Sequence, residues 1–327
     1  MGEKYIFYKP KKSLFRKIVE KTAPLIVAGG VAFGIMDKDI PKEQQSTQEN
    51  VKDFEKYKQE LEESFKQQPD FLSDEIEQSL SSVYSKENKE ATLSEFNGYK
   101  LEIEKEVYGK LFANKEFFAE KYFGHVLKDR DYRQELLSVV MEAADKYGVP
   151  HAVALGMLAV ESGGNPLARS KKDAIGIFQI ITDTAKIYKM NVDKDFPEND
   201  DRSDIVKNAD TAMRILSDYY KILGQWSLAL VAFNGGPNAL EKQLVKLYDL
   251  DMKEGFVTRS GWRQYREKAE EGQINLALIL KNNPEFKNMD AFKYPLKVQI
   301  LAPEMKNILN FGELAFQQGN VEKPEFL

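Results

Sequence analysis

The feature that most constrains the fold is an apolar run, Pro150-His-Ala-Val-Ala-Leu-Gly-Met-Leu-Ala-Val160, which lacks a polar face. Such a run predicts a buried helix. Pro150 suits the first helical position, and Gly163-Gly164 would end the helix. Glu161 then lies in the last turn, on a face that is otherwise apolar.

A carboxylate at this position is a candidate general acid. Apolar neighbours would desolvate Glu161, and the negative end of the helix dipole would repel its charge. Both effects raise the pKa, so that the side chain can hold a proton near neutral pH, as a general acid must. The alternative is a glutamate at the helix end that points into water.

Three ordered motifs accompany this helix. Glu161-Ser162 is followed by Gly176-Ile-Phe-Gln-Ile180 with Thr184-Ala185, and then by Ala232-Phe-Asn-Gly-Gly-Pro237. Together they resemble the signature of the SLT-type lytic transglycosylases, the goose-lysozyme-like enzymes that cleave peptidoglycan. The segment Tyr294-Pro-Leu-Lys-Val298 resembles the closing motif of that family. The resemblance covers about residues 131–305.

The resemblance implies a mainly α, lysozyme-like catalytic domain, preceded here by an additional N-terminal helical region. We expect a small irregular hairpin near 165–180. The implied reaction cleaves the bond between N-acetylmuramic acid and N-acetylglucosamine and leaves a 1,6-anhydro end. Glu161 would be the catalytic acid, and no metal or cofactor is required.

The other motif residues would hold the sugar. Hydroxyl and amide side chains can hydrogen-bond sugar hydroxyls or acetamido groups, and the Gly176–Ile180 segment would line the cleft floor. The predicted substrate-binding residues are Ser162, Gln179, Asn234, Tyr294, Phe178 and Ile177. Tyr294 could instead hydrogen-bond Glu161. For Ser162, Gln179 and Asn234 the alternative is a supporting or helix-capping role, and for Tyr294 it is a place in the core.

Glycosidases usually need two carboxylates, and the sequence offers a single credible one. Asp173 and Asp183 are nearby in sequence, but both fit solvated loop positions better. A hydrolytic muramidase on the same fold would need one of them across the cleft. A non-catalytic glycan-binding or assembly protein is the second alternative to a transglycosylase.

Composition excludes several other classes. The net charge of −5, from 47 basic and 52 acidic residues, gives no basic field for nucleic acid. The absence of cysteine excludes disulfides and thiolate chemistry. Two histidines, His125 and His151, make a histidine metal site or a Ser-His triad improbable.

The chain divides into four predicted parts. Residues 1–40 combine a basic segment with a short hydrophobic run at 24–36, which is a candidate export signal or membrane anchor. The alternative is a short helix packed on the domain or lying on a membrane surface. This predicts membrane association and a place in the cell envelope, on its periplasmic or extracellular face, or in a phage particle. Residues 41–130 form a helical stalk or accessory region that could bind a protein partner, with a turn at Asn97-Gly98. The SLT domain spans 131–310, with 251–290 a possible insertion, and 311–327 form a tail.

Overall fold

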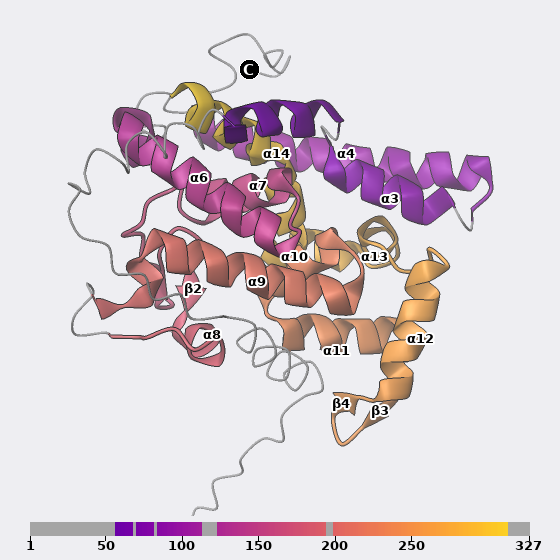
Figure 1. The fold of residues 1–327 in the computed structure, drawn as a ribbon. Helices are drawn as coiled ribbons and strands as arrows, with labels where there is room; N and C mark the ends of the chain where they lie inside the picture. The colour runs from indigo at the N-terminus through magenta and orange to yellow at the C-terminus, as the bar shows by residue number, and fades with distance from the viewer. Residues whose placement is uncertain (1–55, 68–69, 82–83, 113–122, 194–198, 313–327) are drawn as a thin grey trace, which may run out of the picture.

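The structure is a computed structural model that describes residues 56–67, 70–81, 84–112, 123–193 and 199–312. Within these ranges the chain is mainly helical (Figure 1), which confirms the predicted fold class. The predicted basic segment 1–40, with its hydrophobic run at 24–36, lies outside the described residues, as does most of the predicted tail 311–327. Among the described helices, none is both long and apolar enough to span a bilayer.

The elements follow one another in a fixed order. The helices that lie wholly within the described residues are α3 (Phe71–Ser81), α4 (Lys86–Phe112), α6 (Arg130–Tyr147), α7 (His151–Glu161), α8 (Thr182–Ile187), α9 (Ile205–Leu223), α10 (Trp226–Gly235), α11 (Pro237–Tyr248), α12 (Arg259–Glu270), α13 (Leu276–Asn282) and α14 (Asp290–Phe311). Residues 56–67 and 123–128 are also helical. Two 3-10 turns are η3 (Asp201–Ser203) and η4 (Pro284–Asn288). Two antiparallel hairpins pair β1 (Ala174–Ile175) with β2 (Ile180–Ile181) and β3 (Met252–Lys253) with β4 (Phe256–Val257). The first is the predicted hairpin.

Helix α7 is the centre of the core, because its residues from Ala152 to Ala159 are all buried. It packs most extensively against α14. Gly156 makes this packing possible, since a Cβ added there would lie 2.1 Å from the carbonyl oxygen of Val298 in α14. The two helices therefore approach closely enough for backbone to meet backbone, and the end of α7 is fixed relative to α14.

Helices α6, α9 and α10 surround this pair, with α9 packed on both of the others. Their ends follow ordinary capping rules. The side chain of Asp129 accepts from the N–H of Tyr132 at the start of α6, and Asp204 accepts from Lys207 at the start of α9. Gly148 ends α6 in the left-handed conformation.

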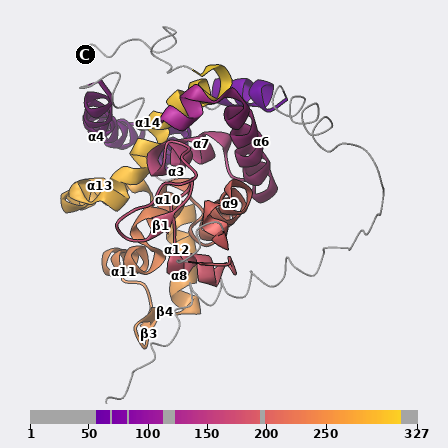
Figure 2. The same cartoon turned by 90° about the vertical axis from the view of Figure 1, so that its left-hand side faces the viewer.

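The N-terminal helices belong to the same core. Helix α4 packs on α13 and α14, and α3 packs on α10 and α14. In both views α4 lies in the upper part of the picture and the β3–β4 hairpin lies at the bottom (Figures 1 and 2). Helices α3 and α4 thus form a layer on the helices that follow, which we call the accessory layer. Residues 251–290 also contribute buried side chains, among them Trp262 and Tyr265.

The turn expected at Asn97-Gly98 is wrong, because α4 continues through both residues. A helical glycine costs only about 1 kcal/mol relative to alanine. Burial of Phe96, Tyr99 and Ile103 on the same helix outweighs that cost.

We predict that Gly156→Ala lowers the free energy of unfolding by about 1–3 kcal/mol, because the new methyl group meets the Val298 carbonyl. Chemical denaturation monitored by circular dichroism measures the change. Gly98→Ala is the matched control, since a Cβ there meets nothing within 4 Å, and it should stabilise the protein by about 0.5–1 kcal/mol. Equal effects of the two substitutions would contradict the close approach of α7 and α14.

Candidate active site

The site is built around Glu161, the last residue of α7, whose side chain is partly buried. The hydroxyl of Tyr294, from α14, donates a hydrogen bond of 2.6 Å to Oε1 of Glu161. Tyr294 is itself 2% exposed. This is the contact with Glu161 that the sequence allowed for Tyr294, and it brings together two residues from helices far apart in the chain.

Burial raises the pKa of Glu161 from 4.5 to about 7, and the hydrogen bond from Tyr294 opposes part of that rise. The expected rise through desolvation is therefore confirmed. The expected contribution of the helix dipole stays a prediction. With a pKa near 7, roughly half of the molecules carry the proton at neutral pH. Glu161 can thus both give and take a proton.

Ser162, the next residue, holds the β1–β2 loop against the end of α7. Its buried hydroxyl donates to the carbonyl oxygen of Ile177 at 2.7 Å and accepts from the N–H of Gly164 at 3.1 Å. These contacts lie within the protein, as in the supporting role considered for Ser162.

The predicted role of Ile177 and Phe178 in substrate binding stays a prediction, and their side chains face the interior of the protein. They are 1% and 0% exposed and belong to the hydrophobic core. Positive φ angles at Gly176 and Gln179 turn the loop so that the two apolar side chains point inward. Burying them from water lowers the free energy more than exposing them beside a polar sugar would.

Gln179 closes the same loop in the left-handed conformation, with φ at 49°. Its amide Nε2 donates to the carbonyl oxygens of Ala168 and Gly176, each at 2.9 Å. These bonds fix the orientation of the half-buried side chain. Its amide oxygen is the atom left to accept a hydrogen bond from a ligand.

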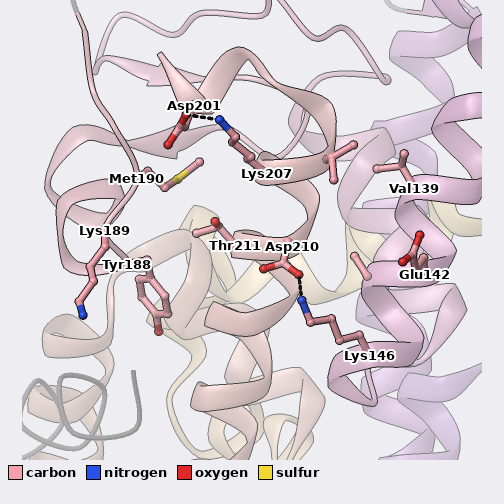
Figure 3. Close-up of a pocket in the computed structure, with 12 residues that line it drawn as sticks. Val139, Glu142, Lys146, Tyr188, Lys189, Met190, Asp201, Lys207, Asp210 and Thr211 are labelled. Atoms are coloured by element: carbon pink, nitrogen blue, oxygen red, sulfur yellow. Dashed lines mark hydrogen bonds and ion pairs between the residues drawn. The ribbon is translucent and has the colours of Figure 1, made fainter. Parts of the chain in front are cut away.

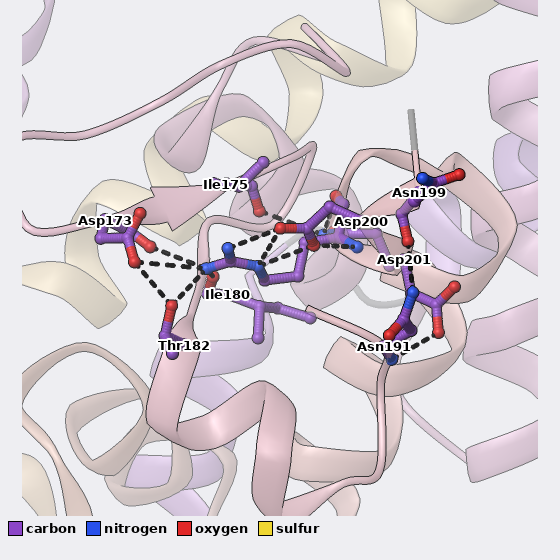
Figure 4. A network of polar contacts seen from close by, with 10 residues as sticks. Asp173, Ile175, Ile180, Thr182, Asn191, Asn199, Asp200 and Asp201 are labelled. Carbon is purple, nitrogen blue, oxygen red and sulfur yellow. Dashed lines mark hydrogen bonds and ion pairs between the residues drawn. The ribbon is translucent and has the colours of Figure 1, made fainter. Parts of the chain in front are cut away.

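A buried charge network ties this hairpin to η3 (Figure 4). Arg202 is fully buried and pairs with Asp200, whose Oδ2 lies 2.7 Å from Nη2. The same guanidinium donates to the carbonyl oxygen of Asp173 at 2.9 Å and to the hydroxyl of Thr182 at 3.0 Å. Burial alone would raise the pKa of Asp200, but the hydrogen bonds and charge of Arg202 bring it below its ordinary value.

Asn208, in the first turn of α9, supports the loop from the other side. Its Oδ1 accepts from the N–H of Phe178 at 2.9 Å, and its Nδ2 donates to the carbonyl oxygens of Ile175 and Arg202. Neither Arg202 nor Asn208 was predicted from the sequence as a supporting residue. An asparagine among the apolar positions of residues 205–223 was the available signal for Asn208, whereas nothing in the polar stretch 199–204 distinguishes Arg202.

Asn234 lies exposed in the last turn of α10. The next residue, Gly235, packs on α14, since a Cβ added there would lie 2.7 Å from the Cβ of Ala291. Ala291 is one helical turn before Tyr294. Asn234 therefore lies beside the end of α14 that carries Tyr294, and can face the same ligand as Glu161.

The two candidate second carboxylates, Asp173 and Asp183, lie in different surroundings. Asp173 accepts from the hydroxyl of Thr182 at 2.6 Å and lies 3.9 Å from Arg202. Asp183 is exposed in the first turn of α8, where an acidic residue favours the helix dipole. Within the described residues, no cluster of three or more His, Asp or Glu side chains could hold a metal ion.

A hollow of about 440 Å³ lies elsewhere, between α6, α9 and the residues after α8 (Figure 3). Its lining residues include two ion pairs, Lys146 with Asp210 and Lys207 with Asp201. None of the predicted site residues lines it. It is therefore separate from the site around Glu161.

We predict that Glu161→Gln stabilises the fold as the pH rises. A folded-state pKa of about 7, above the ordinary 4.5, means that the wild type loses stability between about pH 4.5 and 7 as the carboxylate ionises. Glutamine has no such loss, so the variant should gain about 1–2 kcal/mol over the wild type by pH 8, after allowance for partial exposure. Denaturant unfolding from pH 5 to pH 8 measures it. Parallel curves for the two proteins would show that Glu161 is not desolvated.

Comparison with known proteins agrees with this geometry. The model of the family described as "Transglycosylase SLT domain" matches residues 138–255, a range that holds Glu161, Gln179 and Asn234 but not Tyr294. The chain is similar to membrane-bound lytic murein transglycosylase C of Photorhabdus laumondii, with 27% identity over 114 residues, which are 32% of this chain and 32% of that protein.

The protein of the same name from Yersinia enterocolitica is 34% identical over 83 residues, which are 25% of this chain and 23% of that protein. The chain thus spans about a third or less of the length of these curated relatives. The family resemblance read from the three motifs is confirmed by these matches. Residues 138–255 are thus similar to the transglycosylase SLT domain family, and the rest of the chain lies outside that match.

Proposed function

We propose that this protein is a peptidoglycan lytic transglycosylase with Glu161 as its acid. The observation that carries the proposal is a single, partly buried carboxylate with a pKa of about 7, hydrogen-bonded to Tyr294 within an SLT domain. Glu161 can hold a proton at neutral pH and can also accept one. A single group of this kind suits a reaction in which a hydroxyl of the substrate, and not water, attacks carbon 1.

The reaction proceeds in two proton transfers. Glu161 protonates the oxygen that joins N-acetylmuramic acid to N-acetylglucosamine, and the bond to carbon 1 breaks. The acetamido group of the substrate stabilises the cationic centre. The Glu161 carboxylate then takes the proton of the 6-hydroxyl, whose oxygen bonds to carbon 1 and forms the 1,6-anhydro ring. Atoms balance without water, metal or cofactor.

The remaining site residues have separate roles in this proposal. Asn234 is exposed and offers both amide functions to the sugar, while Gln179 offers its amide oxygen. Ser162 acts indirectly, because its hydroxyl holds the carbonyl oxygen of Ile177. The substrate is the glycan strand of peptidoglycan, and the site of action is the cell envelope, in keeping with the names of the relatives.

We predict that the full-length protein releases anhydro-muropeptides from purified peptidoglycan, and that Glu161→Gln lowers the rate by at least about 100-fold because it removes the acid. Mass spectrometry of the products checks this, since anhydro products are lighter by one water than reducing ones. Glu142→Gln is the matched control, because Glu142 is exposed beside the separate hollow on α6.

The products also decide among the alternatives. Reducing ends would identify a muramidase and direct attention to Asp173 or Asp183 as the group that holds a water. No product from a folded wild-type protein that still binds glycan would identify a binding protein.

We predict that Tyr294→Phe moves the alkaline limb of the pH–rate profile upward by about one pH unit. The lost hydrogen bond stabilised the ionised form of Glu161, so its pKa rises beyond about 7 and the acid stays protonated at higher pH. Tyr265→Phe is the control, since it removes a buried hydroxyl that donates to the carbonyl of Leu223. An unchanged limb in Tyr294→Phe would contradict the assignment of Glu161 as the acid.

A further inference from the structure

A carboxylate from the accessory layer lies at the start of the helix that carries Asn234. Glu75, on α3, accepts hydrogen bonds from the first two N–H groups of α10. The N–H of Trp226 lies 2.5 Å from Oε2, and that of Ser227 lies 3.1 Å from Oε1. Both contacts join segments about 150 residues apart in the chain.

Helix α10 has no cap from its own sequence. Its N-cap residue, Gln225, makes no side-chain capping bond, and its Nε2 donates instead to the carbonyl oxygen of Ile274 at 2.5 Å. The start of a helix needs acceptors for its N–H groups and favours an anion. Burial raises the pKa of Glu75, and the hydrogen bonds from α10 oppose that rise. Glu75 thus replaces the missing local cap.

The opposite end of α10 reaches the candidate active site. The helix spans Trp226–Gly235, about 15 Å at 1.5 Å per residue. It is buried from Ser227 to Ala232, and Gly235 packs on Ala291 of α14. A short, buried helix moves as a unit, so the position of its start also sets the position of Asn234.

Helix α3 also contacts the second helix of the site. The N–H of Leu72 donates to Oε1 of Gln299, on α14, at 3.4 Å. Helix α3 therefore touches both α10, which carries Asn234, and α14, which carries Tyr294. Helix α3 itself lies outside residues 138–255, the segment matched by the family model.

We propose that Glu75 is a positioning residue for substrate binding: it fixes the start of α10 and thereby holds Asn234 in place to bind the glycan. The proposal rests on the proposed function of the site. It assigns to the accessory layer a part in ground-state binding, and none in the proton transfers at Glu161.

The test uses the full chain and soluble peptidoglycan glycan strands, at a temperature where every variant is folded. Glu75→Gln should raise KM about fivefold, since it weakens a cap of ordinary strength, and leave kcat and the pH–rate limb of Glu161 unchanged. Glu77→Gln is the matched control on the same helix, because Glu77 is exposed and pairs with Lys89. A loss of general stability alone would lower the active fraction and leave KM as it is.

A double-variant cycle decides whether Glu75 acts through Asn234. If it does, adding Glu75→Gln to Asn234→Ala raises KM no further. Three results would each overturn the proposal. The first is a double variant in which the KM increases of the two single variants multiply. The others are an unchanged KM in Glu75→Gln and a fall in kcat alone. If Glu75→Gln does not fold, Glu75→Asp, which keeps the charge but shortens the reach, is held to the same expectations.

The positioning role of Glu75 can also be tested if the protein proves to have no transglycosylase activity. If the wild type releases no anhydro product, the Kd of the glycan strands replaces KM in the same cycle. A Kd that rises in Glu75→Gln, but not in Glu75→Gln combined with Asn234→Ala, supports the positioning role without catalysis. An unchanged Kd in Glu75→Gln overturns it.

Discussion

The close packing of α7 on α14 is the contact on which the rest of the site depends. Gly156 has no side chain where the carbonyl of Val298 approaches, so the two helices meet at backbone distance. That approach sets the end of α7 beside the first turns of α14 and brings the Tyr294 hydroxyl to 2.6 Å from Glu161. The raised pKa of Glu161 follows from the same packing, because the helices that position the carboxylate also exclude water from it.

The polar groups buried around the β1–β2 loop have hydrogen-bond or ion-pair partners. Ser162, Asn208 and Arg202 each satisfy backbone groups of the hairpin, and Asp200 balances the charge of Arg202. A buried charge is tolerable only when it is paired and its hydrogen bonds are made. Together these contacts hold Gln179 in a left-handed conformation that most residues avoid. The loop is consequently presented as a rigid surface.

The accessory layer lies outside the segment that matches the family model, and it also stabilises the helices of the site. Helices α3 and α4 share one hydrophobic core with α13 and α14. Tyr108 of α4 reaches the buried Glu304 of α14, at 3.3 Å. Residues before 131 therefore stabilise the helices that form the site, and a catalytic unit cut at residue 131 would expose apolar faces of α13 and α14.

The mainly α fold, the buried helix that ends at Glu161 and the resemblance to the SLT-type transglycosylases could all be predicted from the residues, because apolar periodicity and ordered motifs are local properties of the chain. The motifs also singled out Gln179, Asn234 and Tyr294, but they do not show how these residues are arranged in space. The folded structure was needed to show that Tyr294 donates to Glu161, that Ile177 and Phe178 point into the core, and that Gly98 lies within a continuous helix. The roles of Arg202, Asn208 and Glu75 were likewise hidden. Each depends on contacts between segments distant in sequence, whose burial and hydrogen bonds no local pattern encodes.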